Sequence, residues 1–223
     1  MKKIDTLPFR EAVQDYHFLL CKGYPEKASL NLIAGHYSLS REQRIILYRG
    51  IADSESAEKR RKKLTDSLHE AGLALDGYNV FLTITNYLYG RPLFIGNDGM
   101  LRDTGEVFGS VIHDDIFFKS IDMLFSYLCE IKISSCLIYL DKPVSRSGEL
   151  SQYLKEKMVS CGLSGDAETV KSPDYLLKRI QDKIVCTSDS VIIDKTQGKI
   201  CDLPRLILKS NYNTAFIDLK DCF

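Results

Sequence analysis

The sequence predicts an α/β protein in which a mainly parallel sheet is flanked by helices and preceded by an all-helical N-terminal domain. Two observations predict this fold class. Residues 1–71 carry apolar side chains at helical spacing, whereas from Leu73 onward short β-rich runs alternate with amphipathic helical segments. Because strands that alternate with helices usually build a parallel sheet, we expect a helical domain over 1–71 and an α/β domain over 72–223.

The N-terminal region reads as a series of helices with recognisable ends. The first helix closes at Gly23, and the second begins after Pro25, because glycine suits the end of a helix and proline its first turn. Ser40 opens the third, with Gln43 three residues later in the spacing of a capping box. The fourth is expected over 54–71.

The α/β part is expected to follow the alternation of the apolar pattern. Strands are predicted at 73–75, 136–140 and 183–188, and helices at 116–131, 149–159 and 173–182. Further strands are expected in the tail, at 191–194, 205–208 and 214–219. The segment 78–105 leaves strand and helix open, and its glycines suit a hairpin or loop.

Composition excludes several classes of protein. The 223 residues include 30 basic and 30 acidic side chains, so overall charge would not attract a polyanion. No apolar run approaches the roughly 18 residues that span a bilayer, and the first residues lack the apolar core of a secretory signal. Seven cysteines without a CxxC pair indicate reduced thiols. We therefore expect a cytoplasmic protein that does not associate with membranes.

Aspartates follow three of the predicted strands. Asp76 ends the run in LALDGYN, Asp141 the run in LIYLDKP, and Asp189 the run in VCTSDS. Because the carboxyl ends of parallel strands share one edge, these carboxylates should lie together and repel one another unless a cation neutralises them. Mg²⁺ or Mn²⁺ suits oxygen ligands of this kind. Any single one of these residues could be a turn or cap, as could a fourth acid, Asp174, but four in this order favour a site.

The motifs LDGYN, the strand that ends in Asp141, SPDYLLKRI and VCTSDS together resemble the PIN-like nuclease superfamily, and within it the NYN and YacP-like ribonucleases. The resemblance covers about residues 73–194 and implies a PIN-like fold for the α/β domain. The sequence departs from the family pattern at Pro173 and in the insertion 90–115. As a whole, the chain also resembles an uncharacterised bacterial and archaeal family of unknown function.

The PIN-like resemblance implies metal-dependent hydrolysis of phosphodiesters, usually in RNA. Mg²⁺ or Mn²⁺ would be held by the four aspartates, Asp76, Asp141, Asp174 and Asp189. Asn79 would orient Asp76 or touch the phosphate, and Ser188 and Ser190 would donate hydrogen bonds around the site. Ser145, Arg146 and Ser147 would either grip a phosphate at a helix N-terminus or form a loop and N-cap.

Two functional hypotheses remain at this stage. The first is a divalent-metal-dependent ribonuclease, and the second is a non-catalytic PIN-like module that binds RNA or protein. Phosphatase and primase sites are disfavoured because Asp76 and Asp141 lack the DxDxT and DxD patterns. The basic run 59–63 spreads around a helix and favours a solvated face over a nucleic-acid contact. RNA is the expected partner and DNA is not. The sequence leaves homo-oligomerisation open.

Overall fold

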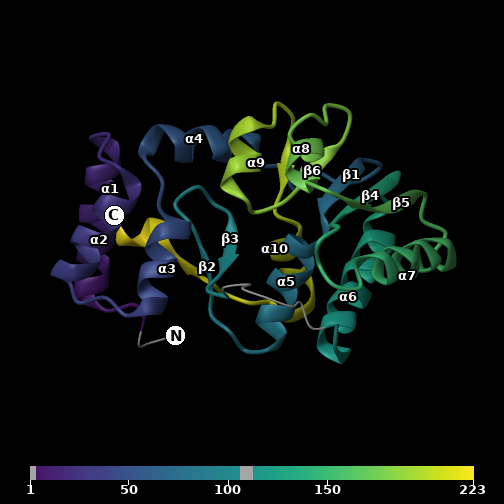
Figure 1. The fold of residues 1–223 in the computed structure, drawn as a ribbon, viewed down its shortest axis with the longest axis horizontal. Coiled ribbons are helices and arrows are strands. Elements are labelled where there is room, and N and C mark those ends of the chain that lie inside the picture. Colours follow the sequence, from purple (N-terminus) through teal and green to yellow (C-terminus); the bar gives the residue numbers. More distant parts are fainter. Residues whose placement is uncertain (1–3, 106–112) are drawn as a thin grey trace. The chain divides into compact units, whose positions relative to one another are not determined.

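A computed structural model of the chain describes residues 4–105 and 113–223 (Figure 1). It divides into two compact units, neither of which is contiguous in sequence. The helical unit comprises Met1–Lys62, Arg91–Gly105 and Ala215–Phe223, and the sheet unit comprises Lys63–Gly90 and Glu106–Thr214. This differs from the division expected between residues 71 and 72. Residues 106–112, in the 90–115 insertion, lie outside the described part of the chain.

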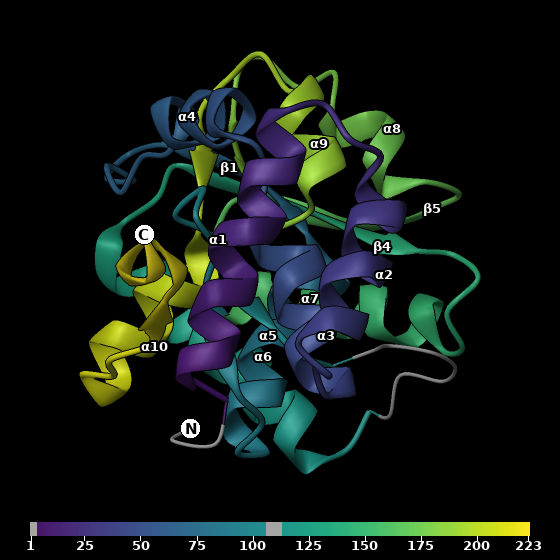
Figure 2. The same cartoon turned by 90° about the vertical axis from the view of Figure 1, so that its left-hand side faces the viewer.

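Four helices occupy the N-terminal part of the chain, at α1 (Leu7–Cys21), α2 (Glu26–His36), α3 (Arg41–Gly50) and α4 (Ser54–Lys63). Figure 2 shows the first three beside one another in the helical unit. The expected capping box at Ser40 is present, because its side chain accepts from the backbone of Gln43, whose side chain accepts from the Ser40 backbone. The fourth helix is shorter than predicted. Beyond Lys63 the chain becomes extended, and Leu64 forms a bridge with Ile200.

A small sheet completes the helical unit. The strand β2 (Leu93–Ile95) pairs antiparallel with β3 (Leu101–Asp103) and parallel with β8 (Ile217–Asp218). The core of this unit combines side chains from the helices with others from the strands and the C-terminal segment, among them Phe9, Tyr16, Leu47, Phe94 and Leu219. Burial of these apolar groups explains why segments far apart in the sequence belong to one unit.

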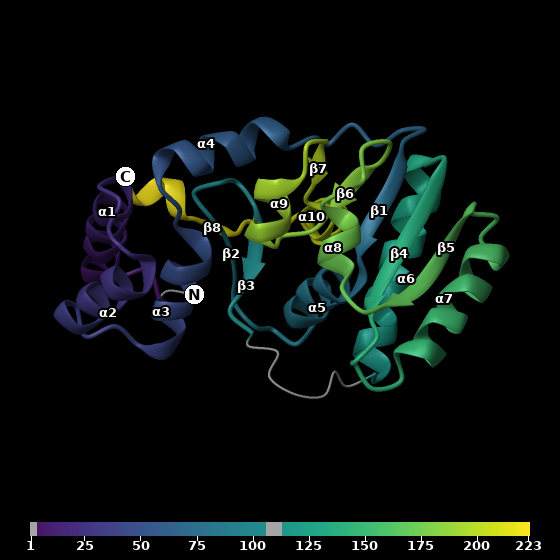
Figure 3. The same cartoon turned by 45° about the horizontal axis from the view of Figure 1, so that its top comes forward.

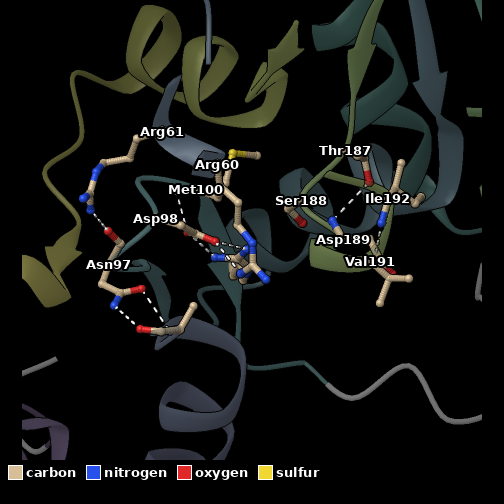
Figure 4. A network of polar contacts seen from close by, with 12 residues as sticks. Arg60, Arg61, Asn97, Asp98, Met100, Thr187, Ser188, Asp189, Val191 and Ile192 are labelled. Atoms are coloured by element: carbon tan, nitrogen blue, oxygen red, sulfur yellow. Dashed lines mark hydrogen bonds and ion pairs between the residues drawn. The ribbon is translucent and has the colours of Figure 1, made fainter. Parts of the chain in front are cut away.

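The turn between β2 and β3 is held by a buried ion pair (Figure 4). Both carboxylate oxygens of Asp98 accept hydrogen bonds from Arg102 at 2.7 Å, and Arg60 donates to Asp98 at 3.1 Å. Burial would raise the pKa of Asp98, but the charge and hydrogen bonds of Arg102, with the charge of Arg60, hold it below its ordinary value. Arg60, which belongs to the basic run 59–63, therefore has a structural role.

The sheet unit is built on five parallel strands in the order β5-β4-β1-β6-β7 (Figure 3). They are β1 (Gly72–Asp76), β4 (Ser135–Asp141), β5 (Gly165–Val170), β6 (Ile184–Cys186) and β7 (Ile200–Cys201). Residues 73–76 of the central strand are buried, and Leu73 lies in register between Cys136 and Ile184. The predicted parallel sheet flanked by helices is confirmed.

Helices cover both faces of this sheet. They are α5 (Gly77–Leu88), α6 (Asp115–Ile131), α7 (Ser147–Ser160), α8 (Pro173–Leu177), α9 (Ser190–Lys195) and α10 (Leu203–Tyr212). Parallel crossovers are right-handed, which places α5, α6 and α7 on one face and α8 and α9 on the other. Phe118 of α6 accordingly meets Tyr153 of α7, with ring centroids 5.2 Å apart. Among the described residues, no helix is long and apolar enough to cross a membrane.

Two predicted strands are wrong. Residues 191–194 and 205–208 lie in the helices α9 and α10, because an aspartate begins each of them. Asp189 accepts from the backbone of Val191 and Ile192, and Asp202 accepts from the backbone of Arg205. The segment 78–89, left open between strand and helix, is helical over α5 and its C-cap. The strands β5 and β7 were not expected, since β5 has one fully buried side chain and no apolar run.

The order of the strands creates a reversal at the centre of the sheet. From β1 the chain moves outward through β4 to β5, then returns across the sheet to β6 and continues to β7. The crevice outside the carboxyl ends of β1 and β6 is therefore the topological switch point, where ligands bind in open α/β sheets. This edge carries Asp76 and the segment 187–189.

The atoms around Gly77 show how tightly this edge is packed. An added Cβ would lie 2.7 Å from Leu140 Cδ2, 2.9 Å from Ile138 Cγ2 and 3.0 Å from the Tyr139 carbonyl oxygen. Gly77→Ala should therefore lower the free energy of unfolding, by about 1–3 kcal/mol for overpacking. Gly148, near the start of α7, has no atom within 4 Å of an added Cβ. Gly148→Ala should leave stability unchanged or raise it slightly. Equal denaturation midpoints for the two variants would contradict this packing.

Candidate functional site

The four predicted aspartates all lie at the carboxyl edge of the sheet. Asp76 is the last residue of β1 and Asp141 the last of β4. Asp174 is the second residue of α8, which packs against both of these strands. Asp189 is the N-cap of α9 and follows β6 by three residues. Each comes from a different segment, and the parallel topology brings these segments to one end of the sheet.

Burial and neighbouring negative charges raise the pKa of two of these carboxyl groups. Asp76 is 8% exposed, and burial raises its pKa to about 7, against the lowering effect of a hydrogen bond from Thr187. Smaller raising effects from the charges of Asp141, Asp189 and Asp174 are included in this value. Burial, followed by the charge of Asp174, also raises the pKa of Asp141. Asp141, Asp174 and Asp189 thus lie near enough to Asp76 for their charges to act on it.

Hydrogen bonds connect the end of β1 to the segment that follows β6. The Thr187 hydroxyl donates to Asp76 at 3.1 Å and accepts from the backbone of Asp189 at 3.1 Å. The backbone and hydroxyl of Ser188 both donate to the side-chain oxygen of Asn79, at 2.8 and 3.1 Å. The predicted site residues Asn79 and Ser188 therefore bond to each other, which holds the start of α5 against this loop.

Asp189 has a structural contact in addition to its place in the cluster. One of its oxygens accepts from the backbone N–H groups of Val191 at 2.7 Å and Ile192 at 3.3 Å (Figure 4). These hydrogen bonds fix the direction of the Asp189 side chain at the N-terminus of α9. Ser190, the first residue of that helix, is half-buried. The cap and the site are therefore not alternatives for Asp189, since one side chain can serve both.

The Ser145–Ser147 segment forms the loop and N-cap that the sequence offered as one of two readings. Arg146 is the N-cap of α7 with a φ of 62°, and its guanidinium lies 2.7 Å from Glu149. Ser147 is buried and donates to the Lys142 carbonyl oxygen at 3.2 Å, while Ser145 is exposed. A phosphate grip by Arg146 would have to compete with Glu149 and stays a prediction.

Two residues of the site were missed from the sequence. Thr187 links Asp76 to Asp189, and the signal for it was its position between a strand end and an acid in VCTSDS. Lys178 lies 3.5 Å from Asp174 and is largely buried. Its signal was the spacing of four residues on a helix, which places the two side chains on one face. Lys178 offsets part of the negative charge of the cluster.

The side chains at this edge fit a hard divalent cation by their chemistry. Asp76, Asp141, Asp174 and Asp189 could supply oxygen ligands, and a cation would offset both the burial and the neighbouring negative charges that raise the pKa of Asp76. Across residues 4–105 and 113–223, no three acidic, histidine or cysteine side chains are close enough together to hold one ion. Metal binding would therefore have to draw the carboxylates closer to one another.

Fold and site together define a doubly wound α/β protein with an acidic cluster at its switch point. Residues 65–206 match the family described as Domain of unknown function (DUF5616), and residues 8–63 match Protein of unknown function (DUF434). The chain is 32% identical over 195 residues to an uncharacterized protein of Methanocaldococcus jannaschii. The aligned region covers 86% of this chain and 92% of that protein. No solved structure matches the chain. The chain belongs to the DUF5616 family.

These matches confirm the predicted resemblance to an uncharacterised family with an archaeal member. The resemblance of residues 73–194 to PIN-like nucleases stays a prediction.

The pKa of Asp76 predicts how stability depends on pH. Its value rises from 3.8 to about 7 on folding, so between these values the folded state binds more protons than the unfolded state. The metal-free protein should therefore lose stability as pH rises through this window, by a few kcal/mol in total, since one pKa unit corresponds to about 1.4 kcal/mol. Asp76→Asn should remove that loss, as measured by denaturant unfolding from pH 5 to 8.

The comparison of the variant with the parent protein isolates Asp76 from other titrating groups. Burial lowers the pKa of His17 and His113, which makes stability rise with pH in both proteins. Asp166→Asn is the matched control. Asp166 lies near the amino end of β5, where Lys155 lowers its pKa. If the free energy of unfolding changed with pH in the same way in the parent protein and in Asp76→Asn, ionisation of Asp76 would not destabilise the fold, which would contradict the prediction.

Proposed function

We propose that the carboxyl edge of the sheet unit is the active site of a Mg²⁺- or Mn²⁺-dependent ribonuclease, which hydrolyses phosphodiester bonds. The observation that carries the proposal is the placement of Asp76, Asp141, Asp174 and Asp189 at the carboxyl edge of the sheet beside its switch point, where burial and the charges of the other three aspartates raise the pKa of Asp76. The resemblance of the LDGYN and VCTSDS segments to PIN-like nucleases supports RNA as the substrate.

The side chains divide into three roles in this proposal. Asp76, Asp141, Asp174 and Asp189 would hold the metal. A bound divalent cation supplies an activated water and neutralises charge on the scissile phosphate. Thr187 orients the Asp76 carboxylate through its hydroxyl, and the pair Asn79 and Ser188 fixes the loop that carries Asp189. Lys178, beside Asp174, places a positive charge near an incoming phosphate.

A second function, an RNA- or protein-binding PIN-like module without cleavage, is favoured by one observation. In the described residues no three potential ligands lie close enough to hold a metal ion together. Pro173 also stands where PIN-like nucleases more often carry an acid or alanine. In such a module the acidic edge would be present although it binds no metal. Metal binding and cleavage therefore have to be measured separately.

Asp189→Asn tests the site while preserving the helix cap, because an asparagine oxygen can accept the same backbone hydrogen bonds. Binding to the folded state raises the melting temperature by mass action. The rise on adding Mn²⁺ should therefore shrink in Asp189→Asn, and cleavage of mixed RNA should fall by orders of magnitude. Without metal, the variant should be at least as stable as the parent protein, since one repelling charge is gone.

Asp166→Asn, at the opposite end of the sheet strands, should keep both the Mn²⁺ response and the cleavage rate of the parent protein. An Mn²⁺ shift that is the same in the parent protein and Asp189→Asn would remove Asp189 from the metal site. A normal Mn²⁺ shift in the parent protein without any cleavage of RNA would favour the non-catalytic module.

A further inference from the structure

A cluster of three side chains joins the end of α1 to the start of α4, within the helical unit. Cys21 is the last residue of α1, and His17 lies one turn before it on the same face. Ser54 is the first residue of α4. The Nε2 atom of His17 lies 3.4 Å from the Cys21 sulfur and 3.1 Å from the Ser54 hydroxyl oxygen. A thiol, an imidazole and a hydroxyl from two helices are therefore in mutual contact.

The Cys21 sulfur also lies at the N-terminus of α4. It accepts a hydrogen bond from the Ser54 backbone N–H at 3.4 Å, and the Ser54 hydroxyl oxygen lies 3.4 Å from it. The first backbone N–H groups of a helix have no acceptor within the helix and carry partial positive charge. A sulfur at such a position is stabilised as the thiolate, which is the nucleophilic form of cysteine. Cys21 is exposed, so a small reagent can reach it.

His17 has the properties of a proton acceptor for this thiol. Burial lowers its pKa, although the charge of Asp53 raises it in part, so the imidazole is neutral at physiological pH. We assign the imidazole proton to Nδ1, so that Nε2 accepts from the thiol. The ring packs edge to face against Phe223, with centroids 4.7 Å apart, which holds its orientation. A nucleophile paired with an oriented base is the arrangement that activates cysteine in enzymes.

The other two exposed cysteines have different surroundings. Cys129 contacts the carbonyl oxygen of Cys161 at 4.0 Å, and Cys161 contacts the Ser160 hydroxyl at 4.0 Å. Burial and the charge of Cys161 raise the pKa of Cys129. Within the described part of the chain, neither sulfur has an imidazole beside it. Exposure alone therefore does not distinguish Cys21, whereas its base and its helix N-terminus do.

We propose that Cys21 is a nucleophilic thiol that forms mixed disulfides with small disulfide molecules, and that His17 is its proton acceptor. The thiol passes its proton to Nε2 of His17, and the Cys21 sulfur attacks one sulfur of the disulfide. A new S–S bond forms, the old one breaks, and the leaving thiolate takes the proton from His17. Cys21 is oxidised and the leaving sulfur is reduced, so no further oxidant is required. Because these residues belong to the helical unit, the inference does not depend on the proposed nuclease.

The reaction with dithiodipyridine tests this proposal, because the reagent is uncharged and the thiopyridone that it releases absorbs light. The rate is measured at one pH near neutrality, and peptide mass spectrometry identifies the modified cysteine. Cys21 should react at least about tenfold faster than Cys129 or Cys161. His17→Gln should slow Cys21 by about tenfold or more, because no imidazole accepts the proton. His36→Gln, which alters an exposed histidine of the same unit, is the matched control and should keep the rate of the parent protein.

Two substitutions of Ser54 separate its hydroxyl from its backbone N–H. Ser54→Ala removes the hydroxyl and keeps the N–H. Ser54→Pro removes both, and proline is well accommodated at the first position of a helix. The reaction of Cys21 should therefore be slower in Ser54→Pro than in Ser54→Ala. Equal rates in these two variants would overturn the role assigned to the N-terminus of α4.

The same reaction shows whether each variant is folded. In a folded variant the buried cysteines should stay unmodified until denaturant is added, and these are Cys136, Cys186, Cys201 and Cys222. A folded His17→Gln variant that reacts at Cys21 as fast as the parent protein would overturn the inference, as would equal rates at Cys21, Cys129 and Cys161 in the parent protein. With oxidised glutathione, a mixed disulfide at Cys21 supports the proposal, and one at Cys129 or Cys161 in its place contradicts it.

Discussion

The candidate site depends on the burial of one carboxyl group, that of Asp76, at the centre of the parallel sheet. Because β1 lies between β4 and β6, its last residue has neighbouring strands on both sides and little access to water. The hydrogen bond from Thr187 ties this carboxylate to the loop after β6, and Asn79 ties the start of α5 to the same loop. The positions of Asp189 and of the first turn of α5 follow from these bonds.

Asp98 and Asp76 are buried carboxyl groups with opposite electrostatic surroundings. Both carboxylates are almost completely buried, and burial raises the pKa of each. Around Asp98 the charge of Arg102 and Arg60 more than reverses this effect, which is how a structural ion pair keeps a buried acid ionised. Around Asp76 the neighbouring charges are carboxylates, and its pKa reaches about 7.

The two matched families meet at the end of α4, where the helical unit gives way to the sheet unit along the sequence. One covers residues 8–63 and the other 65–206, and between them α4 ends and Leu64 pairs with Ile200. The archaeal relative spans most of both. The acidic edge belongs to the sheet unit, so the proposed chemistry needs residues from that unit alone and can be tested by substitutions within it.

The sequence by itself determined the parallel sheet, the N-terminal helices and the acids at strand ends, because these depend on local periodicity, caps and the polarity of each segment. Tertiary structure decided the rest. Residues 191–194 and 205–208 have strand-like composition but become helices once Asp189 and Asp202 cap them, and β5 exists only because β4 offers it an edge. Thr187 and the burial of Asp76 act through contacts between distant segments, and no pattern along the chain records which segments become neighbours.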